Sequence, residues 1–133
     1  MHIAIIENNR SHLHEIGDLI ANLSWTIDIF RDPKEFGKAN LLKYDVIVVD
    51  NMLPGTSGRD LIASIAEKTP AQLFLMGDAT NPFFIDDIEN RNINGFINKA
   101  QPENIVDQLR YIDSKMRINK LAEFETIKLN SMV

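Results

Sequence analysis

The chain has 133 residues and a formal net charge of −5; 44% of its residues are hydrophobic and 25% are charged. These values are ordinary for one globular domain that can bury its own core. The absence of cysteine excludes disulfides and thiolate metal sites, and an acidic chain without a basic stripe argues against binding to nucleic acid. The chain opens without a secretory signal and its apolar runs are too short to span a bilayer, so we expect a cytoplasmic protein with no membrane contact.

Five short apolar runs rich in β-branched residues predict five strands. They cover residues 3–6, 25–30, 46–49, 73–76 and 95–97. The third run is apolar at successive positions, which predicts burial on both faces in the middle of a parallel sheet.

Amphipathic stretches between these runs predict helices. The first begins near Ser11, and the second has Asp32 as its cap, Pro33 at the first helical position and Leu41 and Leu42 on its apolar face. Three more are expected around residues 61–66, 84–88 and 105–116. Strict alternation of strands and helices predicts a doubly wound α/β domain, with helices on both faces of a parallel sheet.

Polar residues follow four of the predicted strands. Because ligands bind outside the carboxyl ends of such strands, we expect Glu7, Asn8, Asp50, Asp78 and Lys99 to meet at one edge of the sheet. Carboxylates can hold Mg²⁺ together with several waters. The cation and an ammonium can neutralise a phosphoryl group, and a carboxylate can attack phosphorus. The pattern therefore points to phosphoryl chemistry at Asp50.

Three segments carry a resemblance to a known family. The segment from Tyr44 to Gly58 resembles the phosphoacceptor strand and loop of response-regulator receiver domains from two-component signalling. Residues 95–100 resemble the last strand of these domains with its lysine, and residues 2–9 resemble their first strand and acidic turn. The order and spacing of elements agree from about residue 1 to residue 114. The resemblance implies a flavodoxin-like fold with the strand order 2-1-3-4-5.

The resemblance also implies roles for single residues. Asp50 would be the phosphoacceptor, and Lys99 would contact the phosphoryl group. Glu7, Asn8, Asp50 and the backbone carbonyl of Met52 would hold Mg²⁺. A histidine kinase or a phosphotransfer protein would be the donor, and the chain would act as a signalling domain, not as an enzyme. This interpretation requires that solvent reaches the Asp50 carboxylate.

The sequence departs from the family pattern at several positions. The usual pair of acids is Glu7 and Asn8, and because a neutral amide attracts a cation less than a carboxylate does, we expect weakened Mg²⁺ binding. Gly77 stands where a Ser or Thr hydroxyl usually contacts the phosphoryl group, and Asp78 follows it. Ala100 replaces the proline that commonly follows the lysine.

The residues beside the expected path of attacking water also bear on function. Met52 and Ala79 cannot orient that water, which predicts slow loss of the phosphoryl group. The hydroxyl that Gly77 lacks could be replaced only by Thr80 or by a shifted loop. The aromatic residue that is common in the fifth strand of the family is present as Phe96.

Two functional interpretations follow. In the first, the chain is a stand-alone, atypical receiver that is phosphorylated at Asp50 and signals through protein contacts, because no DNA-binding module follows. In the second, it is a pseudo-receiver that acts as an interaction module without phosphorylation. A flavodoxin-type cofactor binder is disfavoured, because no Gly-rich or Ser/Thr-rich phosphate loop follows the first strand.

Other features concern partners and turns. The expected partner surface is formed by the fourth helix, fifth strand and fifth helix, where Phe83 or Phe84 would serve as an interface anchor. Gly55 and Gly58 are interpreted as turn residues.

We divide the chain into a receiver domain, residues 1–118, and a C-terminal helical extension or tail, residues 119–133. The second segment carries Leu121, Phe124 and Ile127 between charged residues. It is either a frayed tail or a helix for docking or self-association, which would make the chain a homodimer.

Overall fold

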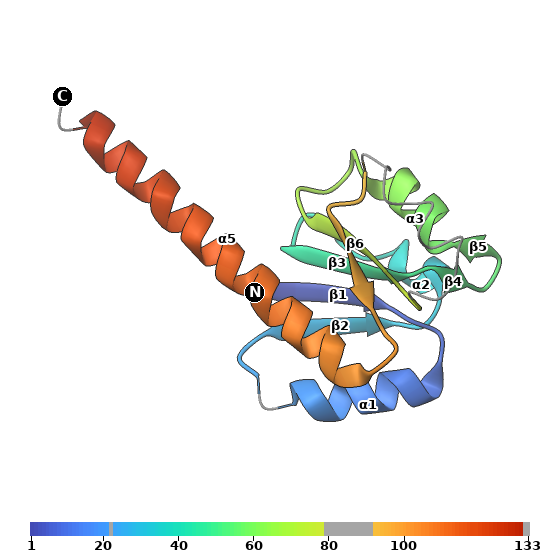
Figure 1. Cartoon of the computed structure of the whole chain (residues 1–133). Coiled ribbons are helices and arrows are strands. Elements are labelled where there is room, and N and C mark those ends of the chain that lie inside the picture. The colour runs from blue at the N-terminus through green and yellow to red at the C-terminus, as the bar shows by residue number, and fades with distance from the viewer. Residues whose placement is uncertain (22, 79–91, 132–133) are drawn as a thin grey trace.

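The computed structural model describes residues 1–21, 23–78 and 92–131. Its centre is a five-stranded sheet with the order β2-β1-β3-β6-β7, in which every neighbouring pair is parallel (Figure 1). The strands are β1 His2–Ile6, β2 Thr26–Phe30, β3 Val46–Asp50, β6 Gln72–Gly77 and β7 Gly95–Asn98. Counted among themselves along the chain, they have the order 2-1-3-4-5, which confirms the predicted flavodoxin-like fold.

Helices cover both faces of this sheet. They are α1 Arg10–Ile20, α2 Pro33–Phe36, α3 Gly58–Ile65 and α5 Pro102–Ser131. The helix predicted over residues 84–88, with Phe83 and Phe84 at its start, lies outside the described residues.

The second helix is shorter than the sequence predicts. Asp32 caps it as expected, since its carboxylate accepts a hydrogen bond from the backbone of Lys34 at 2.8 Å. The helix ends at Phe36, and Leu41 and Leu42 lie beyond it. The side chain of Asn40 accepts the Leu42 N–H at 3.1 Å, an Asn turn that competes with helix formation.

The alternation of side chains along β3 separates two cores. Val46 and Val48 belong to the core that α1 and α5 cover, and Ile47 and Val49 belong to the core under α2 and α3. All five residues of β3 are buried, as the continuous apolar run predicts. The strand that carries Asp50 at its end is thus held from both sides.

A short hairpin follows β3. Its strands, β4 Met52–Leu53 and β5 Thr56–Ser57, pair antiparallel around Gly55, whose φ of +76° fits the expected turn. Ser57 then caps α3 by accepting the N–H of Asp60 at 3.1 Å.

The last helix is a single element of 30 residues that runs beyond the sheet (Figure 1). No helix in the described part of the chain is long and apolar enough to cross a bilayer.

Candidate functional site

Three charged side chains meet where β1, β3 and β7 end. Glu7 follows β1, Asp50 is the last residue of β3, and Lys99 follows β7. The Lys99 ammonium contacts the Oδ2 atom of Asp50 and lies 3.4 Å from the Oε2 atom of Glu7. The parallel sheet therefore brings together an acid–ammonium cluster from residues far apart in the sequence.

Backbone contacts fix the position of Asp50. Its Oδ1 atom accepts the Met52 N–H at 2.8 Å, and the N–H of the neighbouring Asn51 donates to the Met76 carbonyl at 2.8 Å. Gly58 lies directly against Asp50, because a Cβ added to Gly58 would stand 2.2 Å from the Asp50 carbonyl oxygen. Gly58 is thus a close-approach glycine as well as the first residue of α3, a role that its sequence context does not reveal.

Both carboxylates of the cluster are buried. Asp50 is 1% exposed and Glu7 is 2% exposed, whereas the Lys99 side chain is 18% exposed. The expectation that solvent reaches the Asp50 carboxylate is therefore wrong for this conformation. The physical reason is that the Lys99 ammonium and the Met52 backbone each contact one carboxylate oxygen.

Burial changes the proton affinity of Glu7. Loss of hydration, which is the largest cause, and the neighbouring Asp50 carboxylate together raise the pKa of this carboxyl from 4.5 to about 7. The Asn9 N–H, which donates to Glu7 at 2.9 Å, and the Lys99 ammonium act in the opposite direction without cancelling the effect. A large share of Glu7 is therefore protonated near neutral pH.

The same burial acts in the opposite direction on the pKa of Lys99. Burial lowers the pKa of its ammonium, but contact with Asp50 and Glu7 outweighs this, and the pKa is raised above 10.5. Lys99 thus remains charged at neutral pH and balances the Asp50 carboxylate.

The other predicted site residues lie nearby but outside the cluster. Asn8 is exposed, and its amide nitrogen donates to the Arg31 carbonyl at 3.1 Å. Asp78 is exposed after β6, and the backbone of the preceding Gly77 accepts the Lys99 N–H at 3.1 Å. Gly77 brings no hydroxyl to the site, and the replacement that we considered, Thr80, lies outside the described residues together with Ala79.

The donor set can be tested for a cation. Within residues 1–21, 23–78 and 92–131, no group of three or more His, Asp or Glu side chains is arranged to hold a metal ion. Glu7 and Asp50 are the carboxylates that converge, and Lys99 contacts both of them. The residues fit a hard divalent cation only if waters and backbone or amide oxygens supply most of the ligands, which Mg²⁺ accepts.

Comparisons with known proteins address the fold. No protein-family model and no curated protein matches the sequence, but solved structures do. A CheY-like response regulator receiver domain protein from Methanospirillum hungatei JF-1 matches with a TM-score of 0.74 at 13% identity, over 89% of this chain and 97% of that one. The signal receiver domain of an HD domain-containing protein from Pseudomonas fluorescens Pf-5 matches with a TM-score of 0.71 at 18% identity, over 90% of each chain.

The response regulator TrrA from Thermotoga maritima, in complex with Mg²⁺-BeF, matches with a TM-score of 0.69 at 18% identity, over 86% of this chain and 96% of that one. The chain has the fold of a response-regulator receiver domain. At these identities the likeness carries the receiver fold alone, and the chemistry has to be argued from this chain's own site.

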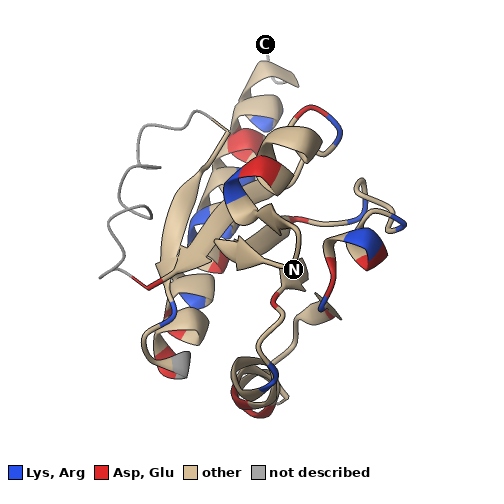
Figure 2. Ribbon diagram, turned by 90° about the vertical axis from the view of Figure 1, so that its right-hand side faces the viewer, with Lys and Arg blue, Asp and Glu red and all other residues tan. Residues whose placement is uncertain are grey.

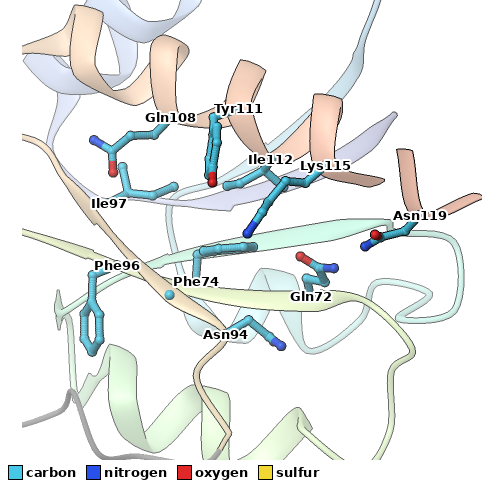
Figure 3. A pocket seen from close by; sticks show the side chains of 11 residues that line it. Gln72, Phe74, Asn94, Phe96, Ile97, Gln108, Tyr111, Ile112, Lys115 and Asn119 are labelled. Atoms are coloured by element: carbon cyan, nitrogen blue, oxygen red, sulfur yellow. The ribbon is translucent and has the colours of Figure 1, made fainter. Parts of the chain in front are cut away.

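The receiver fold also leaves a groove between β7 and α5. It has a volume of about 620 Å³, and side chains of Tyr111 and Lys115 from α5 point toward Phe74 across it (Figure 3). Phe96, expected in the fifth strand, lies at the edge of this groove. Aromatic and polar side chains around a groove are typical of a protein-binding surface.

Proposed function

We propose that this chain is an atypical receiver of a two-component phosphorelay and accepts a phosphoryl group on Asp50. The donor is a phosphohistidine of a partner kinase or phosphotransfer protein. The P–N bond of the donor breaks while an Asp50 oxygen forms a P–O bond, which leaves an acyl phosphate on Asp50 and a neutral imidazole on the donor after protonation. The chain then signals through protein contacts.

The observation that carries this proposal is the contact between Asp50 and Lys99, which are 49 positions apart in the sequence. A phosphoryl group adds roughly 1.5 to 2 negative charges. The Lys99 ammonium is the charge that can compensate them, and its pKa keeps it protonated at neutral pH.

Access to Asp50 requires one local movement. The Lys99 side chain is flexible and partly exposed, so rotation about its carbon–carbon bonds can move the ammonium from the Asp50 oxygen toward the incoming phosphoryl oxygens. In this role Lys99 changes partners and stays in an ion pair, which limits the cost of the movement.

We propose weak binding of Mg²⁺ at the same site. Asp50, Glu7, the backbone carbonyl of Met52 and the amide oxygen of Asn8 would supply protein ligands, and the cation would neutralise phosphoryl oxygens. Binding is weak because Asn8 is neutral, because Glu7 holds a proton at and below about pH 7, and because Lys99 competes for both carboxylates. TrrA from Thermotoga maritima, with the same fold, was obtained as a complex with Mg²⁺-BeF, which supports the assignment.

A second candidate function has its own support. The 1% exposure of Asp50 and the absence of a hydroxyl at Gly77 favour an interaction module that works without phosphorylation. In either case we propose that partners bind the surface of β7 and α5 around the groove of Figure 3.

Intact-mass measurement separates the two candidates. The full chain is incubated with Mg²⁺ and acetyl phosphate, and in a second arm with a phosphorylated histidine phosphotransfer protein. A phosphoryl mass increment on the natural chain, absent from an Asp50→Asn variant, supports the receiver function. No increment with either donor rejects it in favour of the interaction module.

A further inference from the structure

The outer edge of β2 has no neighbouring strand in the described part of the chain. β2 stands at one end of the sheet order and pairs on its inner side with β1 (Figure 1). In such pairing the N–H and C=O of one residue point to the same side, and successive residues alternate. The Thr26 N–H and the Phe30 carbonyl each form a hydrogen bond of 3.0 Å toward β1. The peptide groups of Ile27 and Ile29, which have the opposite parity, therefore face outward.

Two grooves border this edge, and Ile29 lines both of them. One has a volume of about 490 Å³ and follows the strand from Ile27 to Phe30. The other has a volume of about 660 Å³, lies between β2 and α1, and is lined by Arg10, Leu13, His14, Ile29 and Arg31. The Ile29 side chain is 39% exposed. The edge is therefore open along its length and on the face of the sheet that α1 covers.

The groove between β2 and α1 carries positive charge. Arg10 and Arg31 are exposed, and neither side chain forms an ion pair with the residues that the structure describes. His14 also lines the groove and lies 3.7 Å from Asp18. Basic and acidic residues are otherwise interspersed along the helices (Figure 2), and the whole chain has a net charge of −5. Two guanidinium groups without an acid make this groove complementary to carboxylates.

The acid within β2 is already compensated. The Asp28 carboxylate accepts a hydrogen bond from the Tyr44 hydroxyl at 2.8 Å, and the Lys43 ammonium lies 3.2 Å from the same oxygen. Glu35 and Lys38, which line the outer groove, carry opposite charges. The guanidinium groups beside α1 therefore remain as the excess charge at this edge.

We propose that the edge of β2 binds an extended acidic segment of a partner protein as a sixth strand of the sheet. Ile27 and Ile29 each offer one N–H and one C=O to the backbone of that segment. Ile27 packs on the core under α1 and α5, and because side chains alternate along a strand, Ile29 and Arg31 lie on the same face. An apolar residue of the segment packs on Ile29, and an acid two positions away pairs with Arg31 and Arg10.

The β2 strand of a second copy does not match this groove. Its one acid is Asp28, whose carboxylate is held by Tyr44 and Lys43 and is not free to pair with Arg31. An acidic segment of another protein supplies the missing carboxylates. The inference is independent of phosphorylation at Asp50, and its test uses no phosphodonor.

NMR spectroscopy of the full chain, titrated to millimolar concentrations with a blocked Glu-Thr-Val-Thr-Glu peptide, tests the proposal. This sequence is the same in both directions, so parallel and antiparallel addition both set valine beside Ile29 and a glutamate toward Arg31. We expect saturable shifts and slower hydrogen exchange at the amides of Ile27 and Ile29. A Lys-Thr-Val-Thr-Lys peptide, and the acidic peptide with N-methylated amides, should produce neither. No change with the acidic peptide, equal binding of either control, or changes that follow the concentration of the chain alone, which indicate a second copy, overturn the proposal.

Substitutions in the chain locate the contact. Ile29→Pro removes an outward N–H and no hydrogen bond to β1, which an edge strand tolerates, and it should abolish binding while the circular dichroism spectrum is unchanged. The N-methylated peptide decides the same question without altering the chain. Arg10→Gln/Arg31→Gln should weaken binding by about fivefold at low salt. Lys68→Gln/Arg110→Gln, at exposed sites elsewhere, makes the same change in net charge and should leave binding unchanged. Binding that survives Ile29→Pro, or that the arginine substitutions leave intact, overturns the proposal.

Discussion

The raised pKa of Glu7 predicts that the free energy of unfolding falls as the pH rises from about 4.5 to about 7. In this window the folded chain keeps a proton on Glu7 that the unfolded chain has released, so each increase in pH favours unfolding. A pKa raised from 4.5 to about 7, at roughly 1.4 kcal/mol per pH unit, corresponds to about 3 kcal/mol.

Urea unfolding at about pH 5 and about pH 8 measures this change. In a Glu7→Gln variant, which carries no titrating group at that position, the free energy of unfolding should not show this decrease between pH 5 and pH 8. In an Asp50→Asn variant the decrease should be smaller, because the Asp50 charge contributes to the raised pKa of Glu7. A Glu7→Gln variant that loses as much stability across this range as the natural chain would refute the reasoning.

The other shifted groups in the described part of the chain titrate outside this window. The pKa of Asp28 is lowered from 3.8 by hydrogen bonding to the Tyr44 hydroxyl, so its stabilising effect is lost only in stronger acid. Burial and the same contact raise the pKa of Tyr44 above 10, and the pKa of Lys99 lies above 10.5. The comparison with Glu7→Gln therefore isolates one carboxyl.

Three further predictions concern substitutions. Gly58→Ala should lower the free energy of unfolding by about 3 kcal/mol, because the new Cβ meets the backbone of Asp50. Gly17→Ala in helix α1 should raise it by about 0.5–1 kcal/mol, because the new Cβ would have no atom within 4 Å and alanine favours the helix; chemical denaturation measures both. Lys99→Met should lower the free energy of unfolding by about 3 kcal/mol at pH 8 and by less at pH 5, because the buried carboxylates of Glu7 and Asp50 lose the ammonium that pairs with them. Met52→Asn, at a residue 74% exposed, should shorten the half-life of the phosphorylated chain by orienting water, and an equal or longer half-life contradicts this.

The fold was predictable where one pattern dominated locally. The continuous apolar run of β3 predicts its burial on both faces, and the structure confirms it. The overlong prediction for α2 has a local cause too: Leu41 and Leu42 fit a helical period, but the helix ends at Phe36 with Gly37 as its C-cap, and Asn40 forms a separate turn with Leu42. Hydrophobic period alone does not register such competition between a side chain and the backbone.

The sequence could predict which residues of the site lie close together, but not how they are buried. Because parallel strands share one carboxyl edge, Glu7, Asp50 and Lys99 could be placed together from the sequence. Their burial could not, since it depends on which atoms cover each carboxylate, and neither could the approach of Gly58 to the Asp50 backbone. Position along the chain gives no measure of such distances.

The charges of this cluster explain how the receiver fold can bury Asp50 beside the pair Glu7 and Asn8, only one of which is an acid. With Asn8 in place of a second acid, two carboxylates remain, and the Lys99 ammonium balances Asp50 while a proton on Glu7 removes the other charge. The cluster is then nearly neutral, which is the condition under which burial costs least. A phosphoryl group on Asp50 would add negative charge to the cluster. The charge balance could then be restored only by a cation or by exposing the cluster to water. If Asp50 is phosphorylated as we propose, the reaction must either recruit a cation or open the edge of the sheet, and in both cases Lys99 is the residue that has to move.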